Sequence, residues 1–316
     1  MATSPLTIFG WHNVEGTDGF ASSPGVGTAG LTNQLEFLAR FANVVSLIDA
    51  VEALEGGRSV PPRAVALTFD DGYRDNLDIA APLLHHYGLT ATFFLAPELL
   101  GGASPWWEEL AWAMSHSRRT RVSWQGRALV LGDASSREES YGVVIREVKR
   151  VDEVERRCVV SALVAQLDPE DPAGEHRSLI MGWDEAQELH RQGFTIGSHS
   201  LRHSILARET AAAQFQDLLE SRQALQDALG CPADLLAYPN GEIEDFDDTT
   251  IGAARQAGYR AAVTTIGGCN GRRTPLMALR RFVMYPEWGV TGFGVVPRHY
   301  ARALRRRVRS EDRPGG

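Results

Sequence analysis

Two adjacent carboxylates at the end of an apolar segment are the first groups in this sequence that could do chemistry. Residues 64 to 73 read AVALTFDDGY, so a predicted buried strand ends at Asp70, Asp71 and Gly72. Like charges in contact raise one pKa and favour cation binding, which suits a metal ligand beside a base, or a shared proton. A surface turn with Asp71 as a helix cap is the alternative that this fragment leaves open.

A second apolar segment also ends in metal-binding groups. Residues 194 to 203 read FTIGSHSLRH, with His199 and His203 four residues apart. At the start of a helix this spacing places both imidazoles on one side, where they can share a divalent ion with a carboxylate. Two histidines and one aspartate with an open position are typical of hydrolytic zinc sites, and cobalt, nickel or manganese fit similar ligands. We therefore expect a divalent metal, zinc by default.

Together, the TFDDG and SHSLRH segments resemble the polysaccharide deacetylase family, carbohydrate esterase family 4. The resemblance extends over residues 6 to 100 and 178 to 290. It implies that the first aspartate, Asp70, is the catalytic base. It also implies a set of three metal ligands, namely Asp71, His199 and His203. The family's Tyr-Pro segment donates a backbone N–H to the oxyanion, and the resemblance assigns this role to Tyr238, with Pro239 fixing the turn beside the substrate.

Two departures from the family pattern affect the predicted site. Many members have an arginine just before the Tyr-Pro segment that orients the catalytic aspartate, and this chain has leucines there. The family's late Leu-x-His motif supplies the general acid, but residues 264 to 270 contain no histidine. We therefore expect Arg281, on the last predicted strand, to orient Asp70. We expect His12, after the first strand, to be the acid, with a structural histidine as the alternative.

The elements that must position these groups alternate between strands and helices. Strands are predicted over residues 6–11, 64–69, 90–96, 194–198, 235–238, 259–264 and 279–284. Helices are predicted over residues 31–41, 46–54 (with Ser46 as cap), 75–87, 184–192, 208–229 and 246–257. Because the reactive groups follow strand ends, the pattern indicates an α/β fold, a distorted (β/α) barrel of about seven parallel strands.

The pattern changes between about residues 103 and 178, which we interpret as an insertion in a single barrel domain spanning residues 1–300. It contains a helical run to Met114, a hairpin around a Gln-Gly turn, and charged helices over residues 136–167. The insertion packs beside or above the barrel mouth, or is a peripheral subdomain. Trp106 and Trp107 at its start either stack on sugar rings or fix the insertion to the barrel.

Composition excludes some partners. The net charge of −8 argues against nucleic acid, and no window reaches the ~18 apolar residues of a membrane span. The three scattered cysteines fit a reducing compartment and the N-terminus does not read as a secretory signal, so we expect a cytoplasmic protein. A basic tail, residues 301–316, could contact anionic lipid weakly at the inner membrane face. The oligomeric state is left open.

The leading hypothesis is a metal-dependent hydrolase that removes N-acetyl groups from an amino sugar in a glycan, glycolipid or precursor. An O-acetyl esterase or non-sugar amidase would use the same groups. A glycan-binding protein without turnover is the third alternative, favoured by the missing late histidine. Asp70 argues against it, because a binding protein needs no base beside its metal.

Overall fold

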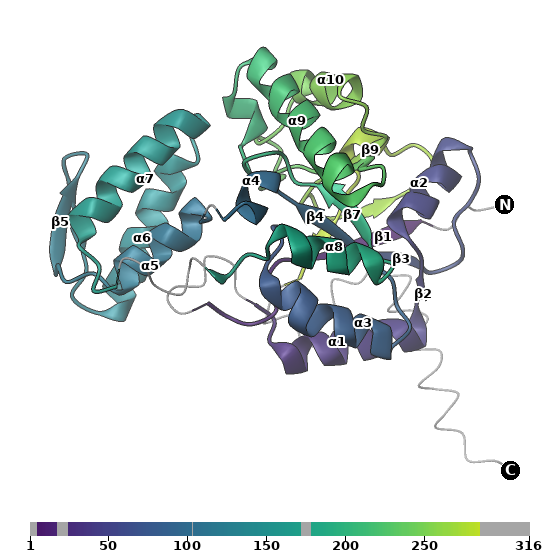
Figure 1. The fold of residues 1–316 in the computed structure, drawn as a ribbon, viewed down its shortest axis with the longest axis horizontal. Coiled ribbons are helices and arrows are strands. Elements are labelled where there is room, and N and C mark those ends of the chain that lie inside the picture. Colours follow the sequence, from purple (N-terminus) through teal and green to yellow (C-terminus); the bar gives the residue numbers. More distant parts are fainter. Residues whose placement is uncertain (1–4, 18–24, 103, 172–177, 285–316) are drawn as a thin grey trace, which may run out of the picture.

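The chain folds into a (β/α) barrel with a helical lobe at one side (Figure 1). The computed structural model describes residues 5–17, 25–102, 104–171 and 178–284. Six parallel strands follow one another around the barrel in chain order. They are β1 (Leu6–Trp11), β3 (Ala64–Phe69), β4 (Thr92–Leu95), β7 (Thr195–Ser198), β8 (Leu235–Ala237) and β9 (Ala261–Val263).

The segment 279–283 closes the ring. Leu279 forms a parallel bridge with Val263 at the end of β9, and β11 (Phe282–Val283) pairs in parallel with β1. This segment is the seventh parallel member, so the predicted barrel is confirmed. Two short strands were not predicted: β2 (Asn43–Val44) runs parallel to β3, and β10 (Cys269–Asn270) runs antiparallel to β1.

Helices cover the outside of the barrel (Figure 1). They are α1 (Thr28–Phe41), α2 (Leu47–Glu55), α3 (Ala81–His86), α8 (Trp183–Arg191), α9 (Ala211–Leu229) and α10 (Asp248–Gln256). Every residue of β1 and β3 is buried, because one strand face lies under helices and the other faces the barrel interior. This explains why these strands read as apolar runs rather than as an alternating pattern.

Three details of the helices differ from the prediction. α1 begins at Thr28, before the predicted helix start at residue 31. The helix expected over residues 75–87 is divided into a π-helix, Asn76–Ala80, and α3. Ser46 precedes α2 but makes no side-chain hydrogen bond to it, so the predicted cap is wrong.

The insertion forms the lobe to the left of the barrel in Figure 1. It consists of α5 (Trp106–Ser115), the hairpin β5 (Arg121–Trp124) and β6 (Arg127–Val130), α6 (Ala134–Val148) and α7 (Glu153–Leu167). Gln125 and Gly126 both have positive φ at the predicted hairpin turn. One continuous cluster of buried side chains includes Phe93 of β4 and Leu110 of α5. The lobe therefore shares a core with the barrel.

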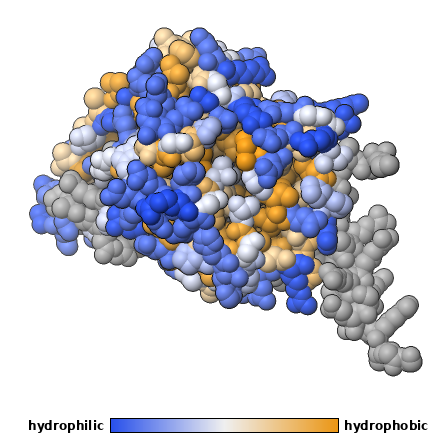
Figure 2. Space-filling view, turned by 45° about the vertical axis from the view of Figure 1, so that its right-hand side comes forward, coloured by the Kyte–Doolittle hydropathy of each residue, from blue (hydrophilic) through white to orange (hydrophobic). Residues whose placement is uncertain are grey.

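The surface is mainly polar. Figure 2 shows a face that is largely hydrophilic, with apolar side chains in patches towards its middle. No helix in the described ranges is long and apolar enough to cross a bilayer. The basic tail expected at residues 301–316 lies outside the described residues.

Candidate active site

The two adjacent carboxylates lie at a sharp turn after β3. The N–H of Asp70 still donates to the carbonyl of Trp11 on β1 (2.9 Å), so Asp70 continues the strand. Asp71 (φ 69°) and Gly72 (φ 80°) are both left-handed, a conformation that costs a residue with a Cβ roughly 1–2 kcal/mol. Asp70 and Asp71 are both buried, so the exposed-turn alternative is wrong.

The two histidines approach Asp71 from the end of β7. His199 Nδ1–H donates to the carbonyl of Ala237 on β8 (2.7 Å), which leaves Nε2 directed at the site. Asp71 Oδ1 lies 3.2 Å from His199 Nε2 and 3.3 Å from His203 Nε2. The ligand atoms of the three residues lie within 4.8 Å of one another, and all three residues are buried.

This arrangement fits a divalent cation. Asp71 Oδ1 is buried and has no hydrogen-bond partner among the described residues, although both Nε2 atoms are close to it. A buried, unpaired carboxylate oxygen is costly, and a cation among the three atoms would remove that cost. Two imidazoles and one carboxylate also leave coordination positions open for water and substrate.

The protonation states of Asp71, His199 and His203 suit the binding of a divalent cation. Burial alone would raise the pKa of Asp71, but the adjacent imidazoles of His199 and His203 outweigh it and hold this pKa well below its usual range. Burial lowers the pKa of His203 to about 4, so its ring is neutral at pH 7. Burial also acts to lower the pKa of His199, but Asp71 and the charge of Asp70 raise it overall. Metal binding should therefore compete with a proton on His199.

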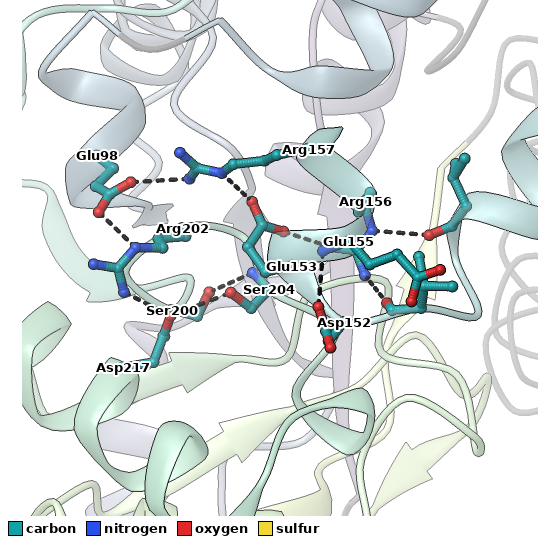
Figure 3. Close-up of polar contacts among 12 residues, drawn as sticks. Glu98, Asp152, Glu153, Glu155, Arg156, Arg157, Ser200, Arg202, Ser204 and Asp217 are labelled. Atoms are coloured by element: carbon teal, nitrogen blue, oxygen red, sulfur yellow. Dashed lines mark hydrogen bonds and ion pairs between the residues drawn. The ribbon is translucent and has the colours of Figure 1, made fainter. Parts of the chain in front are cut away.

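The turn that carries His203 is not the predicted helix. Ser200 (φ 61°) and His203 (φ 56°) are left-handed, so the chain winds tightly between the two histidines. Buried Asp217 of α9 accepts hydrogen bonds from the N–H of Leu201 (2.8 Å) and the hydroxyl of Ser204 (3.3 Å), as Figure 3 illustrates for the side chains. Asp217 thus fixes the turn from the outside of the barrel.

A chain of ion pairs extends from this turn to the insertion (Figure 3). Arg202 Nε lies 2.6 Å from Glu98 Oε1, and Arg157 NH2 lies 3.0 Å from Glu98 Oε2. Arg157 also pairs with Glu153, which pairs with fully buried Arg156 (both 2.6 Å). Since Arg156 and Arg157 belong to α7, the insertion contacts the turn between the two histidines through charge as well as through packing.

Arg281 lies against Asp70, as expected. Its guanidinium forms a two-point ion pair with the carboxylate (2.7 and 2.6 Å) and also donates to the hydroxyl of Thr68 (3.0 Å). A Cβ on Gly10 would lie 2.8 Å from Arg281 Cδ, so the Arg281 side chain fits beside β1 only because residue 10 is a glycine. Burial raises the pKa of Asp70, but the charge of Arg281 reverses the effect and lowers the pKa overall. Asp70 is therefore a carboxylate at neutral pH.

His12 follows β1 and lines the same cleft as Asp71 and His203. It is half-buried. Its carbonyl accepts a hydrogen bond from the side-chain amide of Asn76 (2.8 Å), which fixes the backbone. A positive charge on His12 also contributes to lowering the pKa of Asp70, because the two groups are near each other. The structure thus places His12 near Asp70, in the lining of the cleft.

Tyr238 and Pro239 do not lie as the family resemblance implies. The backbone N–H of Tyr238 donates to the carbonyl of Val263 on β9 (3.1 Å), so it is not free for an oxyanion. The ring of Tyr238 is buried against Phe246, and neither Tyr238 nor Pro239 lines the cleft. The next residue, Asn240, does line it. The predicted oxyanion donor is therefore wrong for this conformation of the chain.

Trp106 and Trp107 line the cleft but are only 7% exposed. The ring of Trp107 lies 4.3 Å from that of His203, and its indole N–H donates to the hydroxyl of Tyr73 (3.0 Å). The guanidinium of Arg156 lies 5.4 Å from the Trp106 ring. The pair thus connects the insertion to the barrel. Stacking of either ring on a sugar stays a prediction.

The cleft also contains residues that the sequence did not reveal. Its volume is about 790 Å³. One wall is formed by residues of α6 and the two residues that follow it, namely Tyr141, Ile145, Arg146, Lys149 and Arg150. The cleft is also lined by Arg208, Asn240, Glu242, Glu244 and Asp245. The insertion therefore borders the candidate site. One compositional signal was available beforehand, since Lys149 is the only lysine in the sequence.

Comparison with known proteins identifies relatives of this architecture. The family model described as polysaccharide deacetylase matches residues 57–117 and 157–262, which make up more than half of the chain. YxkH of Bacillus subtilis (strain 168), which has a provisional polysaccharide deacetylase name, is 21% identical over 232 residues, covering 73% of this chain and 55% of YxkH. The poly-beta-1,6-N-acetyl-D-glucosamine N-deacetylase of Escherichia coli (strain K12) is 36% identical over 78 residues, which are 24% of this chain and 12% of that protein.

Solved structures share the fold. The Streptococcus pyogenes deacetylase PplD, in complex with acetate, superposes with a TM-score of 0.62 at 17% identity, covering 91% of this chain and 96% of PplD. A de-N-acetylase from Aggregatibacter actinomycetemcomitans gives a TM-score of 0.57 at 17% identity, covering 92% of this chain and all of that one.

Proposed function

Because the chain belongs to the polysaccharide deacetylase family, we propose that it is a metal-dependent hydrolase that removes N-acetyl groups from an amino sugar in a glycan, glycolipid or glycan precursor. N-Acetylglucosamine is the proposed sugar, since one matching relative is a poly-beta-1,6-N-acetyl-D-glucosamine N-deacetylase. Zinc is the proposed metal, and cobalt, nickel and manganese are the alternatives that the same ligands fit.

One observation supports this proposal most directly. Asp70 is buried next to Asp71, yet it takes no part in the ligand triad and is paired with Arg281 instead. A carboxylate held in its ionised form beside a metal site has the properties of a general base. A protein that only binds glycans would not need this base.

A divalent ion held by Asp71, His199 and His203 would polarise the acetyl carbonyl and lower the pKa of a bound water. Asp70 takes the proton of the attacking water. Both of its oxygens accept from Arg281, but each keeps a second lone pair for that proton.

The other steps are assigned to Arg281, His12 and Asn240. Arg281 holds the Asp70 carboxylate in one orientation, which preserves its alignment with the water. His12 gives a proton to the nitrogen that leaves with the sugar. With the N–H of Tyr238 used by the sheet, Asn240 is the proposed additional donor for the oxyanion, because it lines the cleft and its Nδ2 has no partner among the described residues.

Acetate release tests this function. The substrates are free, nucleotide-linked, lipid-linked and oligomeric N-acetylamino sugars, each with and without a chelator, and the Asp70→Asn variant is the blank. We expect chelator-sensitive release from one class and at least about a 100-fold loss in the blank.

The same assay separates the alternatives. Release from acetyl esters but from no N-acetyl sugar would indicate an esterase. Metal binding without release from any substrate would indicate a glycan-binding protein. Release that a chelator does not affect would contradict the metal-dependent mechanism.

A further inference from the structure

We propose that the cleft binds an anionic group of the substrate, a phosphate or a carboxylate, and that Lys149 is its main contact. The inference extends the proposed function, because it names the class of amino sugar that the site accepts. The group would lie between the insertion and the barrel, near the metal triad.

Lys149 is unusual in both sequence and position. The chain has 32 lysine and arginine residues, and Lys149 is the only lysine. It follows the last turn of α6, is half-buried, and lines the same cleft as Asp71 and His203. The negative charges of Asp245, Glu242 and, to a smaller extent, Asp71 act to raise the pKa of Lys149. An ammonium group is a compact point charge that binds phosphate well.

Two half-buried cations of this cleft, Lys149 and Arg208, differ from the fully buried arginines in having no carboxylate partner within the described ranges. Fully buried Arg156 and Arg281 each pair with a carboxylate at 2.7 Å or less. Within the described ranges, no carboxylate oxygen lies within 4.0 Å of the side-chain nitrogens of Arg146, Lys149 or Arg208. A partly desolvated charge without a partner is unfavourable, and a bound anion would supply the partner.

The acidic residues that line the cleft do not pair directly with Lys149. Lys149 and Arg208 both act on the pKa of Asp245, so this carboxylate lies near both cations. However, Asp245 Oδ2 accepts the N–H of Glu242 (3.0 Å) and is held within its own loop. Glu242 and Glu244 are exposed. The loop-bound Asp245 and the two exposed glutamates thus leave Lys149 without a direct ion pair.

A structural explanation covers only part of this pattern. Cations at the carboxyl end of a helix stabilise it by interacting with the helix dipole, and Arg146 and Lys149 are both at that end of α6. The helix dipole accounts for the positive charge of Arg146 and Lys149, but exposed cations at the same positions would interact with the dipole equally well. It does not account for the burial of Lys149 within the cleft.

The first experiment uses the single lysine and does not depend on turnover. The metal-loaded protein is reductively methylated, and modification of Lys149 is followed by peptide mass spectrometry, with the N-terminal amine as internal reference. We expect N-acetylglucosamine 6-phosphate or N-acetylmuramic acid to slow the modification about fivefold at four times its Kd, since protection follows 1 + [L]/Kd. Neutral N-acetylglucosamine should not protect, and the more effective anion identifies the class. Equal rates with all three sugars would overturn the proposal.

The second experiment uses kinetics. In Lys149→Gln, the ratio of kcat/KM for an anionic to a neutral N-acetyl sugar should fall about tenfold, and Lys149→Arg should restore part of it. Arg121→Gln, an exposed arginine on the β5 hairpin outside the cleft, should leave the ratio unchanged. An unchanged ratio in Lys149→Gln would contradict the inference. Protection of Lys149 in a protein that hydrolyses no sugar would support the anion site while rejecting the proposed function.

Discussion

At the scale of single residues, the proposed mechanism has Arg281 set the pH range in which Asp70 acts as a base. Burial raises the pKa of Asp70, and the charge of Arg281 more than reverses this. Protonated Asp70 cannot accept a proton, so a lowered pKa keeps the base active to lower pH. The two residues form one ion pair, although 211 positions separate them in the sequence.

Arg281→Gln should shift the acid limb of the kcat/KM profile to higher pH. The substitution removes the cation and leaves the burial, so the pKa of Asp70 rises and the base is protonated over a wider range. The buried charge left behind should also destabilise the fold by roughly 3–5 kcal/mol. pH–rate profiles and urea unfolding measure the two effects. Arg280→Gln, at an exposed neighbouring position, is the control. An unmoved acid limb would show that Arg281 does not tune Asp70.

His12→Ala tests the general acid. Expulsion of an amine requires a proton, whereas 4-nitrophenolate leaves without one. We expect kcat/KM to fall about 100-fold or more on an N-acetyl sugar, and much less on 4-nitrophenyl acetate. A loss of about threefold or less on the sugar would rule out the acid role. Equal losses on both substrates would indicate a structural histidine instead.

Sequence patterns at this scale predict side chains better than backbone groups. The residue types and spacing of Asp71, His199 and His203 were enough to expect a triad, because few other roles suit that combination. Whether the N–H of Tyr238 is free depends on the register of β8 against β9, which no local pattern encodes. The left-handed conformation of Asp71 was equally hidden, since aspartate adopts it only where its surroundings impose it.

At the scale of elements, the turn between the two histidines depends on α9. Its two left-handed residues are unfavourable on their own, so the contacts of Asp217 with Leu201 and Ser204 must hold it. Partners that orient metal ligands typically affect metal affinity 10–100-fold. The sequence predicted α9 well but assigned the turn to a helix, because a four-residue histidine spacing is also typical of helices.

Asp217→Ala should weaken metal binding about tenfold or more, whereas Asp217→Asn should weaken it less. Asparagine retains an acceptor for the N–H of Leu201, and alanine retains none. Isothermal titration with zinc measures the affinities without any substrate. Asp234→Asn, which alters a partly exposed ion pair with Arg222 away from the triad, is the matched control. Equal affinity in wild type and Asp217→Ala would show that the turn is held by other contacts.

Asp217 also makes stability depend on pH. Burial raises its pKa to about 6, so the folded protein holds this proton more tightly than the unfolded chain does. The stabilisation that comes from this tighter proton binding by folded Asp217 is present below pH 4 and is lost as the pH rises through 6. Relative to Asp217→Asn, wild type should lose up to about 3 kcal/mol between pH 4 and pH 8. Urea unfolding of metal-free protein at both pH values gives this difference, and a constant difference would mean that Asp217 does not titrate with folding.

At the scale of the whole molecule, the insertion is part of the site. Its α5 places Trp107 against the ring of His203, and its α6 forms a wall of the cleft. Its α7 is connected through Glu98 to the turn between the two histidines. The sequence located this segment by its change of pattern but could not place it, because contacts between distant segments leave no periodic signal. Barrel and insertion thus share both a core and an active-site boundary.

The metal should therefore stabilise the entire fold. Asp71 and the two histidines are far apart in the sequence and meet only in the folded chain, so the unfolded chain offers no equivalent site. At a free zinc concentration of 100 times Kd, linkage predicts about 2.7 kcal/mol of added stability. The gain should shrink as the pH falls through the raised pKa of His199, because His199 then holds a proton that the metal must displace. Thermal unfolding with zinc and with chelator measures it, and His203→Gln should remove most of it. An unfolding temperature that is the same with zinc and with chelator would contradict a metal site at this triad.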